Sequence, residues 1–334
     1  MHCALSMKKI VLNQLSLFLT ALSFLSRLPA ARLSSFLLAP SKTKLAHENL
    51  SNNSHCEQAD GANLPEKGET KAPQGSKTQN LEQSNYSKQN QQFEQAPTQP
   101  SKQTWQEQEL EEAQINLGKS VLHFPLVGIF LASLAVLPLW AGLGGSNFWL
   151  QAWLYVLFMA WLSRGLHWDG LADLADACAS FSQGEKFWKI IKDSSLGALG
   201  ALVLIFTLIG YIIVVQGLIA KGQWLSLIWA AALGRVACLA LAAQASAYRG
   251  AALAKIFDYA KPKRWAICWA LFLFGLGIFF ISWKACGLAI ILTGEFIFYL
   301  AQLAKKQGGY NGDFLGAAIV LAELITLIAF LLLS

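Results

Sequence analysis

The sequence predicts an all-α, polytopic integral membrane protein with about seven transmembrane helices and an N-terminal interfacial helix. Of its 334 residues, 54% are hydrophobic and only 14% are charged, whereas a soluble domain carries roughly 25% charged residues. Apolar runs near the ~20 residues that a spanning helix needs follow one another. Because backbone hydrogen bonds must close within each segment in lipid, these runs are predicted to be helices. They cover residues 121–142, 147–166, 196–219, 224–246, 265–283, 285–304 and 314–333.

The N-terminus carries a shorter apolar stretch, Ile10–Leu25, behind Lys8 and Lys9. This pattern resembles a signal peptide, but no convincing cleavage site follows and several polar residues interrupt the stretch. We therefore predict a retained helix that lies in the membrane interface or inserts shallowly. Together with Arg27 it forms a first domain, residues 1–40.

A polar segment, residues 41–117, separates this N-terminal domain from a transmembrane catalytic domain predicted at 118–334. The segment is rich in Gln, Asn, Ser, Lys and Glu and poor in apolar residues. Such a composition cannot bury enough surface to offset the entropy of ordering the chain, so disorder is predicted. A passive insert is the favoured interpretation, and a partner-binding tail is the alternative.

The charged residues predict the orientation. The net charge is +6, but the basic residues lie in loops between apolar runs, which favours membrane topology over nucleic-acid binding. The six cysteines lack the spacing of a disulfide framework or a zinc site. One set of loops holds only two basic residues, Lys221 and Lys284. The positive-inside rule therefore assigns the other set of loops to the cytoplasm. With seven spans, the C-terminus then lies on the far side of the membrane. That basic set comprises Arg164, Lys186, Lys189, Lys192, Arg249, Lys255, Lys261, Lys263, Arg264, Lys305 and Lys306.

The strongest chemical motif follows the second apolar run, on the predicted cytoplasmic side. Asp169, Asp173 and Asp176 are spaced i, i+4 and i+7, so they share one face of a helix. The residues between them are Gly, Leu and Ala, which makes a merely solvated polar face the weaker interpretation. Three carboxylates repel one another unless a cation lies among them, and Mg²⁺ takes such oxygen ligands together with substrate phosphates. The motif therefore predicts metal and phosphate chemistry.

Two neighbouring features allow more than one interpretation. His167 lies either on the opposite side of that helix or in the turn before it, as a general base or as a structural hydrogen-bond partner. Lys192 and Asp193 precede a span that begins with Gly197 and Gly200. This helix start suits an anionic group, and equally suits a capping motif followed by glycines for helix packing.

The last span begins with Asn311 and Asp313, inside the glycine-rich segment 308–316. Glycines let a backbone approach a ligand closely, and Asp313 adds another carboxylate. The glycine spacing alone would be ordinary helix packing.

Three ionisable residues, Arg235, Glu295 and Glu323, lie inside predicted spans. Such residues are costly in lipid and usually face an interior cavity. Arg235 suits bidentate phosphate binding, and it equally suits an ion pair with one of the two glutamates. We favour phosphate slightly.

The order of these motifs resembles the cobalamin synthase family, and the resemblance covers nearly the whole chain outside the insert. Asn311, Ala177 and Ser194 stand where the family pattern has Thr, Gly and Pro. The motifs, in order, are Phe24–Pro29, Phe124–Gly128, His167–Asp176, Lys192-Asp193 with its glycines, and Gly308–Gly316 followed by Glu323.

This resemblance implies an enzyme, an adenosylcobinamide-GDP ribazoletransferase that joins adenosylcobinamide-GDP to α-ribazole, or to its 5′-phosphate, and releases GMP. It implies Mg²⁺ as cofactor and the bacterial inner membrane as location, with the active site on the cytoplasmic side. Asp169, Asp173 and Asp176 are then expected to hold Mg²⁺ against the diphosphate. Asp313 would complete the metal site or orient the attacking hydroxyl, and His167 joins the catalytic candidates. The candidates for substrate binding are Arg27, Lys192, Asp193, Arg235 and Asn311. The expected partners are the two substrates, the lipid bilayer and other corrinoid-assembly enzymes, with no nucleic acid.

Two other functions compete with this one. A CDP-alcohol phosphotransferase also places spaced aspartates at the end of membrane helices, but here Asp173 stands where that pattern requires Arg. A cation transporter would use its intramembrane acids as the ion path, whereas these aspartates cluster at one membrane face.

Overall fold

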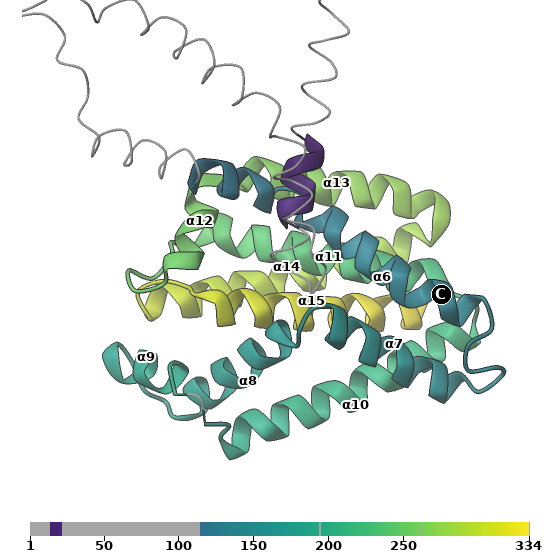
Figure 1. Ribbon diagram of the computed structural model, residues 1–334, viewed down its shortest axis with the longest axis horizontal. Helices are drawn as coiled ribbons and strands as arrows, with labels where there is room; N and C mark the ends of the chain where they lie inside the picture. The colour runs from purple at the N-terminus through teal and green to yellow at the C-terminus, as the bar shows by residue number, and fades with distance from the viewer. Residues whose placement is uncertain (1–13, 22–113, 194, 261, 334) are drawn as a thin grey trace, which may run out of the picture. The chain divides into compact units, whose positions relative to one another are not determined.

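The computed structural model describes residues 14–21, 114–193, 195–260 and 262–333, which form helices joined by short loops (Figure 1). Arg27 and residues 41–113 of the predicted insert lie outside these ranges. Each predicted apolar run corresponds to a helix, and the described ranges contain an isolated backbone bridge but no strand, so the all-α class is confirmed. These seven helices are α6 (Phe124–Trp140), α7 (Phe148–Leu162), α10 (Ala198–Ala220), α11 (Trp224–Gln244), α13 (Lys263–Phe280), α14 (Trp283–Lys306) and α15 (Gly312–Leu333). Three shorter helices are α8 (Leu166–Ala179), α9 (Glu185–Ile191) and α12 (Ala252–Ala260).

The number of helices long enough to cross a membrane is five, or six if Gln114–Val121 and α6, which meet at a 57° bend, count as one span. The prediction of about seven spans is corrected accordingly, although the polytopic class is confirmed. Helix α7 has 15 residues, and at ~1.5 Å per residue it falls short of the roughly 30 Å hydrocarbon core. It ends early because Arg164 and Gly165 have φ angles of 60° and 69°, which no α-helix accommodates.

Successive long helices alternate in direction because short loops join them. Helices α10, α13 and α15 begin, and α11 and α14 end, at the end of the molecule where α8, α9 and α12 lie (Figure 1). The basic residues Lys186, Lys305 and Lys306 lie at this end, and Lys221 and Lys284 lie at the opposite end. The charge asymmetry read from the sequence is therefore an asymmetry between two ends of the helices.

Helices α11 and α15 form the centre of the protein. They pack on each other, and α6 and α13 pack on α11 while α8 and α14 pack on α15. The outer helices α10 and α13 leave large apolar side chains uncovered, among them Phe206 at 71% and Phe279 at 83% exposure. A soluble protein rarely leaves such surfaces uncovered, and they suit contact with lipid tails.

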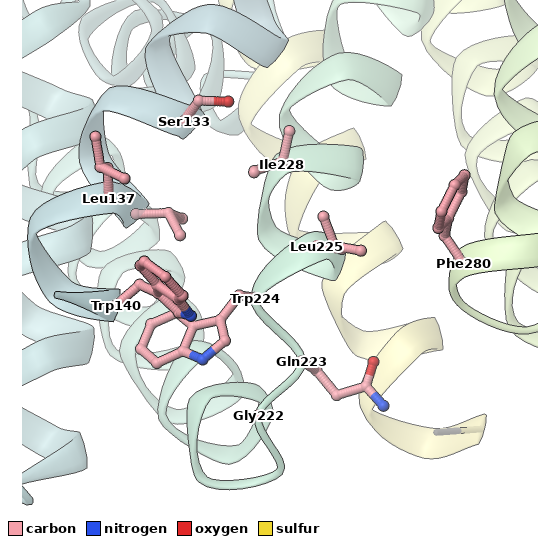
Figure 2. Close-up of a pocket in the computed structure, with 10 residues that line it drawn as sticks. Ser133, Leu137, Trp140, Gly222, Gln223, Trp224, Leu225, Ile228 and Phe280 are labelled. Atoms are coloured by element: carbon pink, nitrogen blue, oxygen red, sulfur yellow. The ribbon is translucent and has the colours of Figure 1, made fainter.

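The end of the molecule opposite α8 carries an open hollow between α6, α11 and α13 (Figure 2). Trp140 and Trp224 line it together with the Gly222–Gln223 turn. Tryptophan is enriched where a membrane meets water. None of the residues that line this hollow is ionisable, whereas the three aspartates of α8 lie at the other end of the helices.

The N-terminal segment is helical over its described part, residues 14–21, as predicted for the stretch 10–25. Phe18 contacts Phe130 of α6 edge to face, with ring centroids 6.2 Å apart, and Gln14 Oε1 lies 3.0 Å from His123 Nε2. The helix thus packs on the bundle, and its interfacial position stays a prediction. The predicted domain boundary after residue 117 falls inside the helix Gln114–Val121.

Candidate active site

Glycines allow α8 and α15 to approach each other backbone to backbone. A Cβ atom on Gly170 would lie 2.7 Å from the Cα of Asp313, and one on Gly316 would lie 3.1 Å from the Cα of His167. A side chain at Gly170 would collide with the backbone of α15, and one at Gly316 would push the backbone of α8 away by a few tenths of an ångström, so the two glycines permit the close crossing. The crossing brings Asp313, at the start of α15, to the aspartate face of α8.

The aspartates predicted to share a helix face do lie on one helix, α8. Asp169 is exposed and Asp173 is half-buried. Burial, followed by the charges of Asp169, Asp313 and Asp176, raises the pKa of Asp173 to about 6. The three neighbouring carboxylates therefore oppose the ionisation of Asp173, and a bound cation would relieve that repulsion.

Asn311 orients the carboxylate of Asp313. Its Nδ2 donates to Asp313 Oδ2 at 2.6 Å, and its Oδ1 accepts a hydrogen bond from the backbone N–H of Phe314 at 3.3 Å. The side chain thus caps α15 and restrains Asp313 at the same time. A role of Asn311 in substrate binding stays a prediction.

Asp176 occupies the N-terminus of α10. Its Oδ2 accepts a hydrogen bond from the backbone N–H of Gly197 at 2.8 Å, and its Oδ1 accepts one from the N–H of Gly200 at 2.7 Å. The anion that the sequence places at this helix start is therefore a carboxylate of the chain itself. The predicted metal role of Asp176 and this capping role compete for the same two oxygens.

The residue types of the cluster suit a hard cation, but their present arrangement does not form a complete metal site. Among the described residues, no group of three or more Asp, Glu, His or Cys side chains is arranged to hold a metal ion as it stands. Asp169 and Asp173, however, offer carboxylates that accept no hydrogen bond within the described part of the chain, beside the restrained Asp313. Mg²⁺ commonly takes only one or two protein carboxylates and completes its shell with water and substrate phosphates. The residues present therefore fit such an ion once substrate supplies the remaining oxygens.

His167 belongs to α8 and is buried, with 7% of its surface exposed. Burial first, and then the charge of Arg235, lowers the pKa of His167 to about 3, so the imidazole is neutral at physiological pH and a poor proton acceptor. Its Nε2 is buried with no hydrogen-bond partner in the described part of the chain. With Asp169 and Asp313 it lines a cavity of about 280 Å³.

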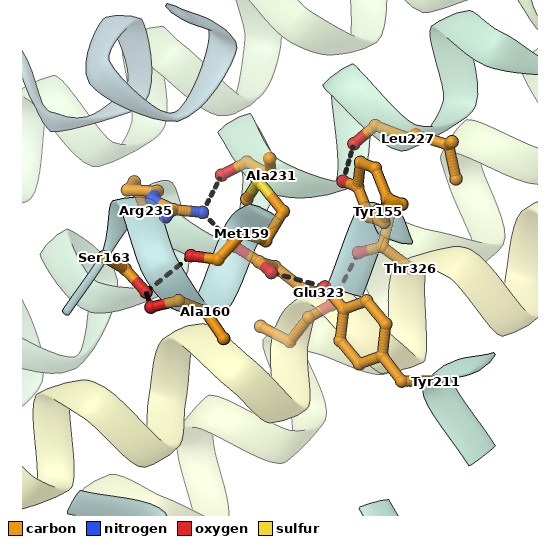
Figure 3. Close-up of polar contacts among 11 residues, drawn as sticks. Tyr155, Met159, Ala160, Ser163, Tyr211, Leu227, Ala231, Arg235, Glu323 and Thr326 are labelled. Carbon is orange, nitrogen blue, oxygen red and sulfur yellow. Dashed lines mark hydrogen bonds and ion pairs between the residues drawn. The ribbon is translucent and has the colours of Figure 1, made fainter. Parts of the chain in front are cut away.

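Arg235 and Glu323, two of the charges inside the predicted spans, contact each other in the interior of the helices (Figure 3). Arg235 is 1% exposed and forms an ion pair with Glu323, which also accepts a hydrogen bond from the Tyr211 hydroxyl. The Nη1 of Arg235 donates in addition to the backbone carbonyl of Ala231 at 3.0 Å. The arrangement is thus the structural bridge rather than the slightly favoured phosphate site. Glu295, which was expected to face an interior cavity, is exposed on α14 instead.

Lys192 and Asp193 line an open hollow of about 580 Å³ beside α9. Trp188 and Tyr248 also line it and stack with ring centroids 3.9 Å apart. Asp193 does not cap α10, because its Oδ1 accepts hydrogen bonds from the N–H and hydroxyl of Ser195, which lower its pKa. The hollow combines two lysines, two acids and an aromatic wall, because Glu185 and Lys189 line it as well.

Two sets of lining residues were not among the site residues predicted from sequence, although Phe124 belongs to one of the quoted motifs. Phe124, Cys238 and Phe257 line the cavity beside Asp169, and Trp188 and Tyr248 line the hollow beside Lys192. Apolar side chains in a membrane protein carry no signal that separates a pocket wall from ordinary packing. For Trp188 and Tyr248 a signal was available, since each aromatic residue directly precedes a basic residue in the sequence, Lys189 and Arg249.

Membrane-length helices, a carboxylate cluster at one end and a cavity beside it define a class: a polytopic membrane protein suited to chemistry on phosphate groups. Comparison with known proteins narrows this class. The family model described as cobalamin-5-phosphate synthase matches residues 97–331, so the chain belongs to the cobalamin-5-phosphate synthase family.

The similar proteins are bacterial and share a common name. An adenosylcobinamide-GDP ribazoletransferase of Nitratidesulfovibrio vulgaris (strain DSM 19637 / Miyazaki F) is 35% identical over 216 residues, covering 65% of this chain and 86% of the relative. A second, from strain DP4, is 38% identical over 228 residues, covering 64% and 87%. One from Escherichia coli O139:H28 is 34% identical over 225 residues, again covering 64% and 87%. No solved structure matches this chain.

Proposed function

We propose that the chain is an adenosylcobinamide-GDP ribazoletransferase, which moves the adenosylcobinamide phosphate group onto α-ribazole, or onto its 5′-phosphate, and releases GMP. The observation that carries this proposal is the carboxylate cluster at the α8–α15 crossing, in a chain whose relatives bear that name. The reaction requires positioning and charge neutralisation of phosphates rather than a covalent nucleophile. The cluster supplies groups for both.

In this proposal Asp313 accepts a hydrogen bond from the attacking ribose hydroxyl, and Asn311 keeps its carboxylate in place. The hydroxyl oxygen bonds to the phosphorus nearest cobinamide, the bond from that phosphorus to the bridging oxygen breaks, and GMP leaves with this oxygen. The hydroxyl proton passes to a carboxylate of the cluster. Asp169 and Asp173 would hold Mg²⁺, which supplies neutralisation of the diphosphate charge when bound. Asp176, whose two oxygens cap α10, would join them only by releasing the N–H groups of Gly197 and Gly200. His167 stays neutral and lines the cavity as an uncharged polar side chain.

The lysine hollow is proposed to receive the guanosine diphosphate half of the substrate. Lys192 is exposed there, and an ammonium group attracts phosphate oxygens. The stacked rings of Trp188 and Tyr248 beside it present an apolar wall for a nucleobase. Arg235 is assigned to structure, because its buried guanidinium forms an ion pair with Glu323. Arg27 remains a candidate on sequence alone.

We further propose the bacterial inner membrane as location, with the carboxylate cluster on the cytoplasmic side. The basic residues gather at the end of the helices that bears the cluster, which the positive-inside rule assigns to the cytoplasm. The C-terminus then lies on the far side, because α15 begins at the cluster end. Other corrinoid-assembly enzymes are proposed as partners at the cytoplasmic face.

The decisive experiment follows the nucleotide that purified protein releases from adenosylcobinamide-GDP and α-ribazole with Mg²⁺. GMP should appear in step with the corrinoid product, and only with the metal. Asp173→Asn should lower turnover on the order of 10²–10³-fold, because one stabiliser of phosphate charge is lost. Glu295→Gln, an exposed acid on α14, is the matched control and should retain wild-type turnover. Release of CMP from a CDP-alcohol instead, or turnover by Asp173→Asn equal to the control, would refute the proposal.

A further inference from the structure

The cavity beside the carboxylate cluster is a built pocket. It lies between α6, α8, α11, α12 and α15 and has a volume of about 280 Å³. Most of its lining is apolar, including Phe124, Phe257 and Ile319, all buried. The rings of Phe124 and Phe257 meet edge to face, with centroids 5.5 Å apart. The pocket thus offers aromatic walls to a ligand.

The polar side chains on the pocket wall are few: two carboxylates, one imidazole and the thiol of Cys238. Asp169 and Asp313 line it, so it opens onto the groups assigned to the phosphate chemistry. His167 lines it as well, and its Nε2 is a buried polar atom that lacks a partner in the described chain. Buried polar atoms nearly always have partners, so this nitrogen indicates a ligand that supplies one.

We propose that this pocket binds the flat heteroaromatic base of the ribazole acceptor, with a ring nitrogen of the base paired to His167 Nε2. This inference rests on the proposed transferase function and deepens it. A base held there would place its attached ribose at Asp313 and Asp169, where the attacking hydroxyl is needed.

Size and polarity select this occupant over the other parts of the substrates. Pockets for drug-sized ligands span roughly 300–1,000 Å³, so about 280 Å³ admits one bicyclic ring system and excludes a corrinoid macrocycle. Guanine is also bicyclic, but its edge carries several donors and acceptors that each require a partner. The two carboxylates on the wall, Asp169 and Asp313, would accept from guanine N–H groups, but they are assigned to the metal and to the attacking hydroxyl, so the imidazole of His167 remains for the base. A base with one free ring nitrogen and otherwise apolar edges satisfies the pocket.

Filling the pocket tests the proposal in steady-state kinetics. Ala254 is fully buried and lines the pocket, so Ala254→Leu should raise the KM for α-ribazole by roughly 10-fold or more through overpacking. The KM for adenosylcobinamide-GDP should stay within about 2-fold. Ala266→Leu is the matched control, because Ala266 is buried and lines a separate cavity among α11, α13 and α14. It should change neither constant.

A second measurement uses the wild-type protein and is independent of whether the variant folds. Free 5,6-dimethylbenzimidazole should inhibit competitively against α-ribazole and not against adenosylcobinamide-GDP. It should inhibit more strongly than 5,6-dimethylindole, which lacks the second ring nitrogen for His167. Competition against adenosylcobinamide-GDP, or no inhibition by either compound, would overturn the assignment, as would an unchanged KM for α-ribazole in a folded Ala254→Leu.

Different results would refute the transferase function and the binding of the ribazole base in the pocket. A wild-type protein that releases no GMP from the two substrates overturns the transferase function and the pocket assignment together. A wild-type protein that releases GMP, while 5,6-dimethylbenzimidazole does not compete with α-ribazole, overturns only the pocket assignment. A lipid tail as occupant would show as KM values that Ala254→Leu leaves unchanged.

Discussion

Replacing Gly200 by alanine tests the contact between Asp176 and the start of α10. A Cβ atom at this position would fall on the Asp176 carboxylate and would lie 2.8 Å from the carbonyl oxygen of Ala172. The carboxylate must therefore move, and the close packing of α10 on α8 must loosen. Gly210→Ala in the same helix is the matched control, because a Cβ atom there meets nothing within 4 Å.

The expected magnitude follows from two charge-assisted hydrogen bonds, from Gly197 N–H at 2.8 Å and Gly200 N–H at 2.7 Å. Such bonds contribute roughly 1.5–3 kcal/mol each. Because Asp176 is half-exposed, water replaces part of this energy, and alanine improves helix propensity by about 1 kcal/mol. The net destabilisation should be about 1–3 kcal/mol. Gly210→Ala gains the propensity without the clash and should be neutral or slightly more stable.

The assay compares thermal unfolding and turnover of the purified variants. Gly200→Ala should lower Tm by roughly 2–12 °C, at about 2–4 °C per kcal/mol for a domain of this size. Its kcat should fall on the order of 10²-fold, because displacement of a catalytic group by about 1 Å has that effect. If Gly200→Ala and Gly210→Ala share the same Tm and kcat, Asp176 does not hold α10 in the way described.

Three other outcomes are expected. The pKa of Asp173 is raised to about 6, so its neutral form dominates below this pH. At limiting Mg²⁺, kcat/KM should therefore fall about tenfold per pH unit below 6, and saturating Mg²⁺ should move this inflection to lower pH. An unchanged inflection in Asp173→Asn would contradict the assignment. Glu323→Leu leaves Arg235 buried without its partner and should lower the free energy of unfolding by about 3–5 kcal/mol. The double variant Glu323→Leu with Arg235→Met should recover most of the folded protein. Equal yields of the single and double variants would refute the pairing. Deletion of residues 45–112 should leave most transferase activity, and loss of activity in a membrane-inserted deletion would show that the insert does more than connect.

The helices were predictable from sequence because lipid leaves an apolar run little choice but to form a helix. The predicted runs 224–246 and 314–333 differ from α11 and α15 by two residues or fewer at each end. The errors arose where local backbone geometry ended a helix inside an apolar run. The run 147–166 stops at Leu162 because Arg164 and Gly165 adopt positive φ angles, and hydropathy does not register such angles.

The candidate site was predictable in its residue types but not in its pairings. The spacing of Asp169 and Asp173 was enough to place both on one helix face. Asp176 accepts hydrogen bonds from two N–H groups at the start of α10, which lie 21 and 24 residues later in the sequence. This pairing depends on how α8 packs against α10. The partner of Arg235 was likewise not predictable from sequence, because phosphate and Glu323 suit a guanidinium group equally and only the tertiary structure decides between them.

The pairing of Arg235 with Glu323 also constrains how the protein is made. The two residues are 88 positions apart, so at roughly 5–20 residues per second a ribosome needs on the order of 4–18 s to supply the glutamate after the arginine. During that interval α11 carries a charge that costs about 2.5–3.5 kcal/mol at the centre of a membrane helix. Helix α11 must therefore stay beside the insertion machinery, or in contact with another polar group, until α15 emerges. Helix α15 thus completes the insertion of a helix whose arginine was made 88 residues earlier, and a chain that stops before α15 is a substrate for membrane quality control.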